Sequence, residues 1–260
     1  MKLLSSFILG VGLLTPAGFA LAADAPLAGA TSPSAPAPVS LEADGVTFGM
    51  NAESVAKLYD RWWEKHFIPK YRKANPGPRT RELDFELAEN KKVLRRVAIF
   101  DGRSTSFDKS DFRDEFAHGN GETMTSTKVV RRLPGTGEAK GVNYTRRFFF
   151  FQDKLWKIYD EYRLDPQGPF GADFKEATSR VEASVGAGAK RTRGPDSGNE
   201  NVVFEAGNSR VRVVKLAANR IAIVRSDNAL AKGVLDRRAQ QAKVAGEAPP
   251  LDEDIQAVIR

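Results

Sequence analysis

The stretch Val142–Leu164, VNYTRRFFFFQDKLWKIYDEYRL, decides the fold, because it holds two apolar segments on either side of a short polar turn. Apolar and polar side chains alternate along the second segment, and both segments are rich in aromatic and β-branched residues. This pattern is typical of an antiparallel β-hairpin. We therefore predict strands over residues 142–151 and 155–164, paired with each other.

Two registers of this hairpin are open to the sequence. A turn at residues 153–154 sets Arg147 opposite Asp160, whereas a turn at residues 152–153 sets Arg147 opposite Ile158. Favourable cross-strand pairs contribute about 0.2–1 kcal/mol each, and the first register has more of them. We therefore expect the turn at residues 153–154.

The four consecutive phenylalanines, 148–151, must divide between the two faces of their strand. We expect Phe149 and Phe151 to enter the core with Trp156 and Ile158. The opposite face has aromatic side chains with a basic rim, as interface hot spots do, unless another element covers it. The predicted binding residues on that face are Phe148, Phe150, Lys157 and Tyr159.

Before the hairpin, the hydrophobic period is that of helices. Asn51 is a predicted N-cap for a first helix, which Pro69 should end or kink. A second helix should begin near Thr80. Ser110 should cap a short third helix that buries Phe112 and Phe116, and a strand should follow over residues 123–133.

After the hairpin, a similar order returns. Asp173 can cap a helix that runs to about Val185, and turn signals separate three strands. A last helix should follow Asp227 and bury Leu230 and Val234, whereas residues 186–200 resemble a mobile basic loop. The predicted strands cover residues 201–206, 209–217 and 220–226.

These elements predict an α+β protein with two helix-plus-antiparallel-sheet units. Phe170-Gly171-Ala172-Asp173 echoes Phe48-Gly49-Met50-Asn51, which either reflects a duplication or arises by chance. We assign a signal peptide (1–22), a disordered Ala/Pro/Ser linker (23–44), a first unit (45–168), a second unit (169–245) and a flexible tail (246–260).

The first 22 residues have the pattern of a secretory signal peptide. Lys2 supplies the positive charge, an apolar run follows, and Ala20-Leu21-Ala22 resembles a cleavage site. We therefore expect export, to a periplasm or to the medium. No later stretch is long and apolar enough to cross a bilayer, so we expect no transmembrane segment.

Composition narrows the kind of protein. The chain has no cysteine, which excludes disulfides, a lipid anchor on cysteine and thiolate chemistry. Its net charge of +7 would favour nucleic acid in a cytosolic protein, but export favours other anionic partners. The alternative is a mixed, solvated surface without a defined site.

The sequence resembles one family of cell-envelope proteins. A Gly-Met-Asn helix start at Gly49, Met50 and Asn51 is followed by Val55 and later by an aromatic hairpin. This pattern resembles the small lipoprotein of the outer-membrane β-barrel assembly machinery and β-lactamase inhibitor protein, which has two such units in tandem. The resemblance implies a non-enzymatic, protein-binding module, although the lipid-bearing cysteine and the paired disulfides are missing.

Catalytic and metal chemistry have little support in the sequence. The acidic cluster of Asp108, Asp111, Asp114, Glu115, His118 and Glu122 fits neither a calcium loop nor a zinc helix. On a helix Asp114 would meet His118. We predict no catalytic residue, no metal and no cofactor; pairs such as Glu82 with Glu86, or Asp114 with Glu115, leave open a cell-wall or polysaccharide hydrolase.

The favoured hypothesis is an exported binding module that engages a protein or an anionic envelope polymer. Besides the open face of the hairpin, Arg210 and Arg212 share a face of the second predicted sheet and are candidate ligands for an anion. We expect no nucleic-acid partner. The oligomeric state is open, and so is a purely structural role in the envelope.

Overall fold

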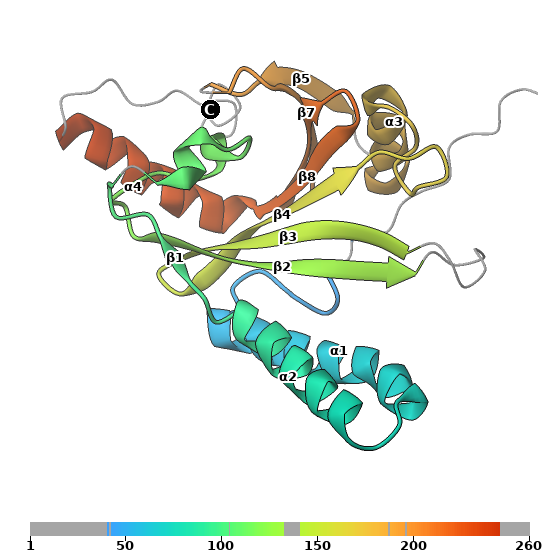
Figure 1. Cartoon of the computed structure of the whole chain (residues 1–260). Coiled ribbons are helices and arrows are strands. Elements are labelled where there is room, and N and C mark those ends of the chain that lie inside the picture. Colours follow the sequence, from blue (N-terminus) through green and yellow to red (C-terminus); the bar gives the residue numbers. More distant parts are fainter. Residues whose placement is uncertain are drawn as a thin grey trace, which may run out of the picture. The chain divides into compact units, whose positions relative to one another are not determined.

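The structure is a computed structural model that describes Leu41 and residues 43–244, apart from 104, 133–140, 187 and 196. The predicted signal peptide, nearly all of the predicted linker and the predicted tail lie outside the described residues. Within them, four α-helices accompany one antiparallel sheet of eight strands, so the α+β class is confirmed (Figure 1).

The sheet has the order β1-β2-β3-β4-β8-β7-β6-β5. Each half is a four-stranded meander whose first strand lies at an edge, and the two last strands, β4 and β8, pair at the centre. The halves therefore form one continuous sheet. The strands are β1 (Ala98–Ile99), β2 (Glu122–Arg132), β3 (Gly141–Phe151), β4 (Lys154–Arg163), β5 (Ala189–Arg193), β6 (Glu200–Ala206), β7 (Ser209–Ala217) and β8 (Arg220–Asp227).

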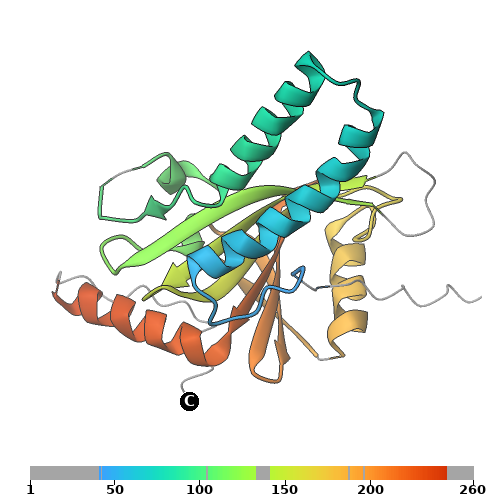
Figure 2. The ribbon, with the colours of Figure 1, turned by 90° about the horizontal axis from the view of Figure 1, so that it is seen from below.

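Helices cover both faces of the sheet (Figures 1 and 2). Helices α1 and α3 pack on one face, here called the α1 face, together with the inner side of α2. Helix α4 and two short 3-10 helices, η1 and η2, pack on the other, the α4 face. The helices are α1 (Ala52–Lys73), α2 (Pro78–Val93), η1 (Ser106–Lys109), η2 (Arg113–Glu115), α3 (Phe174–Val185) and α4 (Asn228–Val244).

Each face has its own apolar core. On the α1 face, Tyr59 and Phe67 of α1 and Val181 of α3 pack with the inward side chains of the strands, including Phe148 and Phe150. On the α4 face, the core joins η2, α4 and the sheet. Its buried members include Phe100, Phe112, Phe116, Phe149, Trp156, Tyr159 and Val234, so the predicted burial of Phe112, Phe116 and Val234 is confirmed.

The predicted hairpin forms, but its predicted register is wrong. The turn lies at Gln152 and Asp153, both with positive φ (50° and 57°), as a type I′ turn requires. Phe150 pairs with Leu155 and Phe149 with Lys157, so Trp156 is the extra residue of a β-bulge. The bulge shifts the pairing beyond it by one residue.

The bulge brings Arg146, rather than Arg147, opposite Asp160. It also turns Trp156 onto the α4 face with Phe149, whereas Ile158 lies on the α1 face with Phe148 and Phe150. The predicted grouping of Phe149 with Ile158 is therefore wrong. An unbroken period of two assigns every residue beyond a bulge to the wrong face.

Local capping fixes the helix starts. The side chain of Asn51 accepts a hydrogen bond from the Ser54 amide (2.8 Å), and that of Asp173 accepts one from Glu176 (2.8 Å), as predicted. Pro69 does not end the helix, which was one of its two predicted effects, since α1 continues through it to Lys73. Proline has no N–H to donate to the carbonyl of Lys65, four residues earlier. Lys65 is exposed, so water can donate to that carbonyl instead.

Two other local predictions are corrected. Residues 186–200 are not a continuous loop, because Ala189–Arg193 pair with β6 as an edge strand. An edge strand needs only backbone pairing on one side, so its side chains carry little pattern. Ser110 does not cap a third helix: it ends η1, which Thr105 caps, and η2 follows separately.

Buried charge joins the two halves of the sheet on the α1 face. The carboxylate of Asp160 in β4 accepts two hydrogen bonds from Arg146 of β3 (2.7 and 2.8 Å) and one from Arg225 of β8 (2.6 Å). Arg146 also donates to the Tyr59 hydroxyl and to Asp44 (both 2.9 Å). These contacts link α1, the preceding segment and three strands around one carboxylate.

Replacing this carboxylate should destabilise the protein more than replacing its neighbour. Asp160→Asn leaves two arginines with less compensation in the interior and should cost about 3–5 kcal/mol. Glu161→Gln, one residue on and only partly buried, should cost at most about 1 kcal/mol. Urea unfolding measures both; equal losses would contradict the role given to Asp160.

Candidate functional site

The predicted binding face of the hairpin is not open. Phe148 and Phe150 are 0% and 1% exposed under α1, whereas Lys157 and Tyr159 are 3% and 0% exposed on the opposite face. The four side chains therefore share neither a face nor access to solvent. Other elements therefore cover the hairpin, which was the alternative to an open binding face.

Arg210 and Arg212 do share a face of β7, as predicted, but both bind carboxylates of this chain. Arg210 donates to Glu205 (2.8 Å), and Arg212 donates to both carboxylate oxygens of Glu115 (2.5 and 2.7 Å). A partner anion would have to compete with these internal ion pairs.

The acidic cluster has an internal role: it lies across the basic α4 face of the sheet. Glu115, from η2, bridges Arg212 and Lys157 (Nζ–Oε2 3.0 Å), and Asp111 pairs with Arg220. Glu122 holds Arg238 of α4 through two hydrogen bonds of 2.7 Å. The acidic side chains thus fix η2 and α4 to the sheet.

Burial and charge oppose each other in this cluster. Burial acts to raise the pKa of Glu115, but the positive charges of Arg212 and Lys157 outweigh it and hold that pKa below its ordinary value. Burial lowers the pKa of Lys157 to about 8, although Glu115 acts in the opposite direction. Glu115 is therefore a carboxylate at neutral pH and has no proton to give as a general acid.

Asp114 and His118 do not meet as a helix would have allowed. His118 Nε2 lies 2.5 Å from Asp108 Oδ1, and Asp114 binds the hydroxyl and amide of Ser197. Asp114 and His118 therefore each bind a different residue, because no helix spans residues 114–118 to bring them together. Among the residues that the structure describes, no group of three His, Asp or Glu side chains could hold a metal ion.

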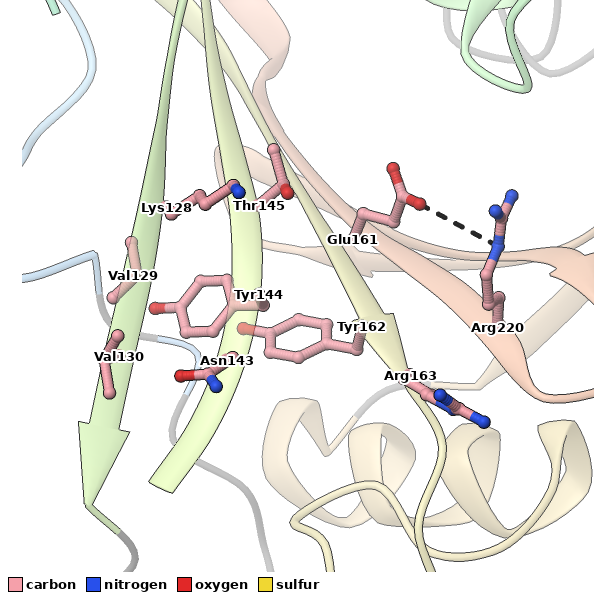
Figure 3. A pocket seen from close by; sticks show the side chains of 10 residues that line it. All are labelled: Lys128, Val129, Val130, Asn143, Tyr144, Thr145, Glu161, Tyr162, Arg163 and Arg220. Carbon is pink, nitrogen blue, oxygen red and sulfur yellow. Dashed lines mark ion pairs between the residues drawn. The ribbon is translucent and has the colours of Figure 1, made fainter. Parts of the chain in front are cut away.

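A hollow of about 460 Å³ lies beside the last residues of β4 and the first residue of β8 (Figure 3). Arg220 and Glu161 face each other in it, with Nε and Oε1 3.8 Å apart, and Glu161 also pairs with Arg147 (3.0 Å). Much of its charge is therefore satisfied internally. It is lined by Lys128, Val129, Val130, Asn143, Tyr144, Thr145, Glu161, Tyr162, Arg163 and Arg220.

A large excess of positive charge lies in the helical hairpin, residues 52–96, formed by α1, α2 and the turn after α2. It contains twelve lysines and arginines and seven acidic residues, so it carries +5 of the chain's net charge of +7. Each acidic side chain already has a partner within the hairpin. Those acids are Glu53, Asp60, Glu64, Glu82, Asp84, Glu86 and Glu89.

Half of the hairpin's cations are left without a counter-charge from the described residues, and four of these form a row on α1. We call the row, made of Lys57, Arg61, Lys65 and Arg72, the basic stripe; all four side chains are exposed. Intervals of four and seven residues place them on one side of a helix, over about 22 Å. Ile68, 46% exposed, lies between the last two.

The stripe points away from the sheet. The buried residues of α1, which include Tyr59, Trp63 and Phe67, occupy the opposite side of the helix. On α2, Phe85 is 68% exposed, and Leu83 is the only fully buried residue among those of the helix. The hairpin thus offers solvent a basic surface with a few exposed apolar side chains.

The sequence contained a signal for this stripe that the predictions did not use. Lys57, Arg61 and Lys65 recur every four residues in a helix whose apolar face was recognised. Recognising that their charges stay uncompensated requires the contacts of α2, because Glu64 and Asp60 on the same helix would otherwise be available partners.

No protein-family model, curated protein or solved structure matches this chain. Across the residues that the structure describes, no helix has the length and apolar character needed to span a membrane. Any functional conclusion must therefore come from the geometry and charges of this chain.

The buried position of Glu115 leads to a stability prediction. Glu115→Gln removes the charge that compensates Lys157 and Arg212 and should cost about 3–5 kcal/mol. Glu200→Gln, which breaks partly exposed pairs at the edge of the sheet, should cost at most about 1 kcal/mol. Denaturant unfolding at pH 7 measures both losses.

The same variant has a defined pH dependence. The pKa of Glu115 is lower in the folded chain than its ordinary value of 4.5, so its stabilising effect is present above that pH and is lost as the pH falls through the folded value. The free-energy difference between wild type and Glu115→Gln should shrink below pH 4.5. A difference that stays constant down to acid unfolding would contradict this assignment.

Proposed function

We propose that this protein is an exported, non-enzymatic binding module that holds a linear anionic polymer of the cell envelope against its helical hairpin. The observation that carries the proposal is the basic stripe. Four exposed cations stand in one row, while six carboxylates of the hairpin are in ion pairs and the seventh, Asp84, accepts a hydrogen bond from Tyr71. A row of uncompensated charge attracts a partner with a matching row of negative charges.

A straight row favours a polymer over a compact anion. A single phosphate or carboxylate would be bound best by cations that converge on it, whereas the stripe spreads its charges over about 22 Å. The hollow in Figure 3 is less suited to this role, because Arg220 and Glu161 are engaged with partners of this chain.

The alternative of a cell-wall or polysaccharide hydrolase has weaker support. Glu82 and Glu86 are bound by Arg79 and Lys70 on the hairpin surface, and neither lines the described hollow. Glu115 is buried and charged, and Asp114 is held by Ser197. None of these pairs lines the hollow in Figure 3, where a sugar would have to sit between two carboxyl groups.

The proposal keeps three expectations from the sequence: export through the signal peptide, a periplasmic or secreted location, and a duplicated helix-plus-sheet unit. The topology supports duplication, since a helix precedes a four-stranded meander in each half and the first strand of each meander lies at an edge. A family relationship to the lipoprotein and inhibitor modules named above also remains part of the proposal.

Removing the charges of the stripe should remove polymer binding. The variant Lys57→Gln/Arg61→Gln/Lys65→Gln/Arg72→Gln keeps good helix formers in α1 and should bind polygalacturonate at least about tenfold more weakly than wild type. Binding by wild type should also weaken as salt is raised. Isothermal titration calorimetry, with neutral dextran as the uncharged polymer, measures both effects.

A matched variant separates the stripe from net charge alone. Lys154→Gln/Lys175→Gln/Lys232→Gln/Arg237→Gln removes the same number of exposed charges elsewhere and should bind nearly as wild type does. Equal losses in the two variants would show diffuse attraction and contradict the proposal. Binding to phosphatidylglycerol vesicles but not to the polymer would also overturn it, as would hydrolysis of the polymer.

A further inference from the structure

The outer edge of β2 has a neighbouring strand over only part of its length. Strand β1 has two residues, and they pair with Thr123 and Met124. Strand β2 continues to Arg132, fully paired with β3 on its inner side. In the described part of the chain, no strand lies beside the outer edge of β2 after Met124.

One hydrogen bond identifies which residues of β2 direct their backbone groups outward. The carbonyl of Glu122 accepts from the Phe100 amide (3.4 Å), which lies on the β1 side. Outward and inward residues alternate in an antiparallel strand, so Ser126, Lys128 and Val130 also direct their N–H and C=O groups outward.

Side-chain exposure along the same stretch separates the two faces of the sheet. Thr127 and Val129, whose backbone groups face β3, are buried, whereas Ser126 is partly exposed and Lys128 and Val130 are exposed. The outward carbonyl of Lys128 has only a long contact with the Thr127 hydroxyl (3.4 Å). Three residues at intervals of two therefore direct backbone donors and acceptors away from β3, and no strand within the described residues pairs with them.

The other edge of the sheet differs. In β5, Lys190, Arg191 and Arg193 are exposed, and a dense row of charged side chains is one means by which proteins block pairing at an edge. Between Met124 and Val130, β2 has a single cation, Lys128. Next to this stretch, Val97 just before β1 is 45% exposed and Val130 is 38% exposed.

We propose that an extended, acidic segment of a partner protein pairs with β2 from Ser126 to Val130 and completes the edge that β1 begins. Main-chain hydrogen bonds to the three outward residues hold the segment, as in other cases of strand addition. A glutamate opposite Lys128 forms a cross-strand ion pair on the α4 face, and the alternate, apolar side chains of the segment lie on the α1 face beside Val129.

Charge selects this occupant over a second copy of the chain. Residues 123–132 contain Lys128, Arg131 and Arg132 and no acidic residue. Pairing two copies along this edge would bring two cationic strands side by side, which is unfavourable. An acidic segment neutralises the same charges.

Two methylated peptides test whether the backbone of β2 is the binding surface. The probe is a fluorescein-labelled peptide of alternating glutamate and valine, and its binding is followed by fluorescence anisotropy. N-methylation of the glutamate amides, which face β2 when glutamate is opposite Lys128, should weaken binding at least about tenfold. N-methylation of the valine amides, which face away, should leave binding nearly unchanged.

Variants of β2 give a second readout. Lys128→Pro removes the outward amide without touching the bonds to β3 and should abolish binding, whereas Lys128→Ala should weaken it only a few-fold. The four-residue stripe variant of α1 should bind the peptide normally, which separates this site from the proposed function. Hydrogen exchange of the Ser126, Lys128 and Val130 amides should slow when the peptide is bound.

Three results would overturn the proposal. Equal binding of the two methylated peptides would mean that charge alone attracts them. Absence of binding by the unmodified peptide would mean that the edge accepts no strand. Concentration-dependent dimerisation in sedimentation, lost in Lys128→Pro but kept in Lys128→Ala, would assign the edge to a second copy.

Discussion

The buried carboxylate of Asp160 is the contact on which the arrangement of the sheet depends. It binds Arg146 from the first half and Arg225 from the second, at the seam where β4 and β8 pair. Arg146 extends the contact to α1 through Tyr59. A buried ion pair adds little net stability when compared with apolar packing, but a misplaced one is costly. The pair therefore favours one register over its neighbours.

The β-bulge at Trp156 and this ion pair depend on each other. Without the extra residue, the turn at Gln152 and Asp153 would place Arg146 opposite Tyr159, on the wrong side of the strand to reach Asp160. With it, arginine and carboxylate face the same way, and Trp156 fills space on the α4 face. The single extra residue thus allows the ion pair on the α1 face and adds to the apolar core on the α4 face.

On both faces of the sheet, carboxylates compensate buried cations, but they come from different segments of the chain. On the α1 face the counter-charges come from the strands themselves and from Asp44. On the α4 face they come from a separate segment, in which Glu115 and Asp111 cover Arg212 and Arg220. The buried cations of both faces are thus compensated within the chain, whereas the exposed basic stripe of the hairpin is not.

The sequence predicted where the helices and strands lie better than it predicted which face of the sheet each side chain occupies. Alternation and capping were sufficient for the strands β6 to β8 and for the start of α3 at Asp173, because those signals are local. The hairpin faces could not be predicted, since Leu155 to Asp160 is buried on both sides and such a strand has no polar face to orient it. The basic stripe was visible as a spacing, but its lack of counter-charges depends on contacts between helices. The strand order also has a consequence for biosynthesis. Strand β4 stays without its second neighbour until β8 has been made, more than fifty residues later, so a chain emerging in order carries an unprotected central strand meanwhile. During that interval the free edge of β4 is open to pairing with a strand of another chain.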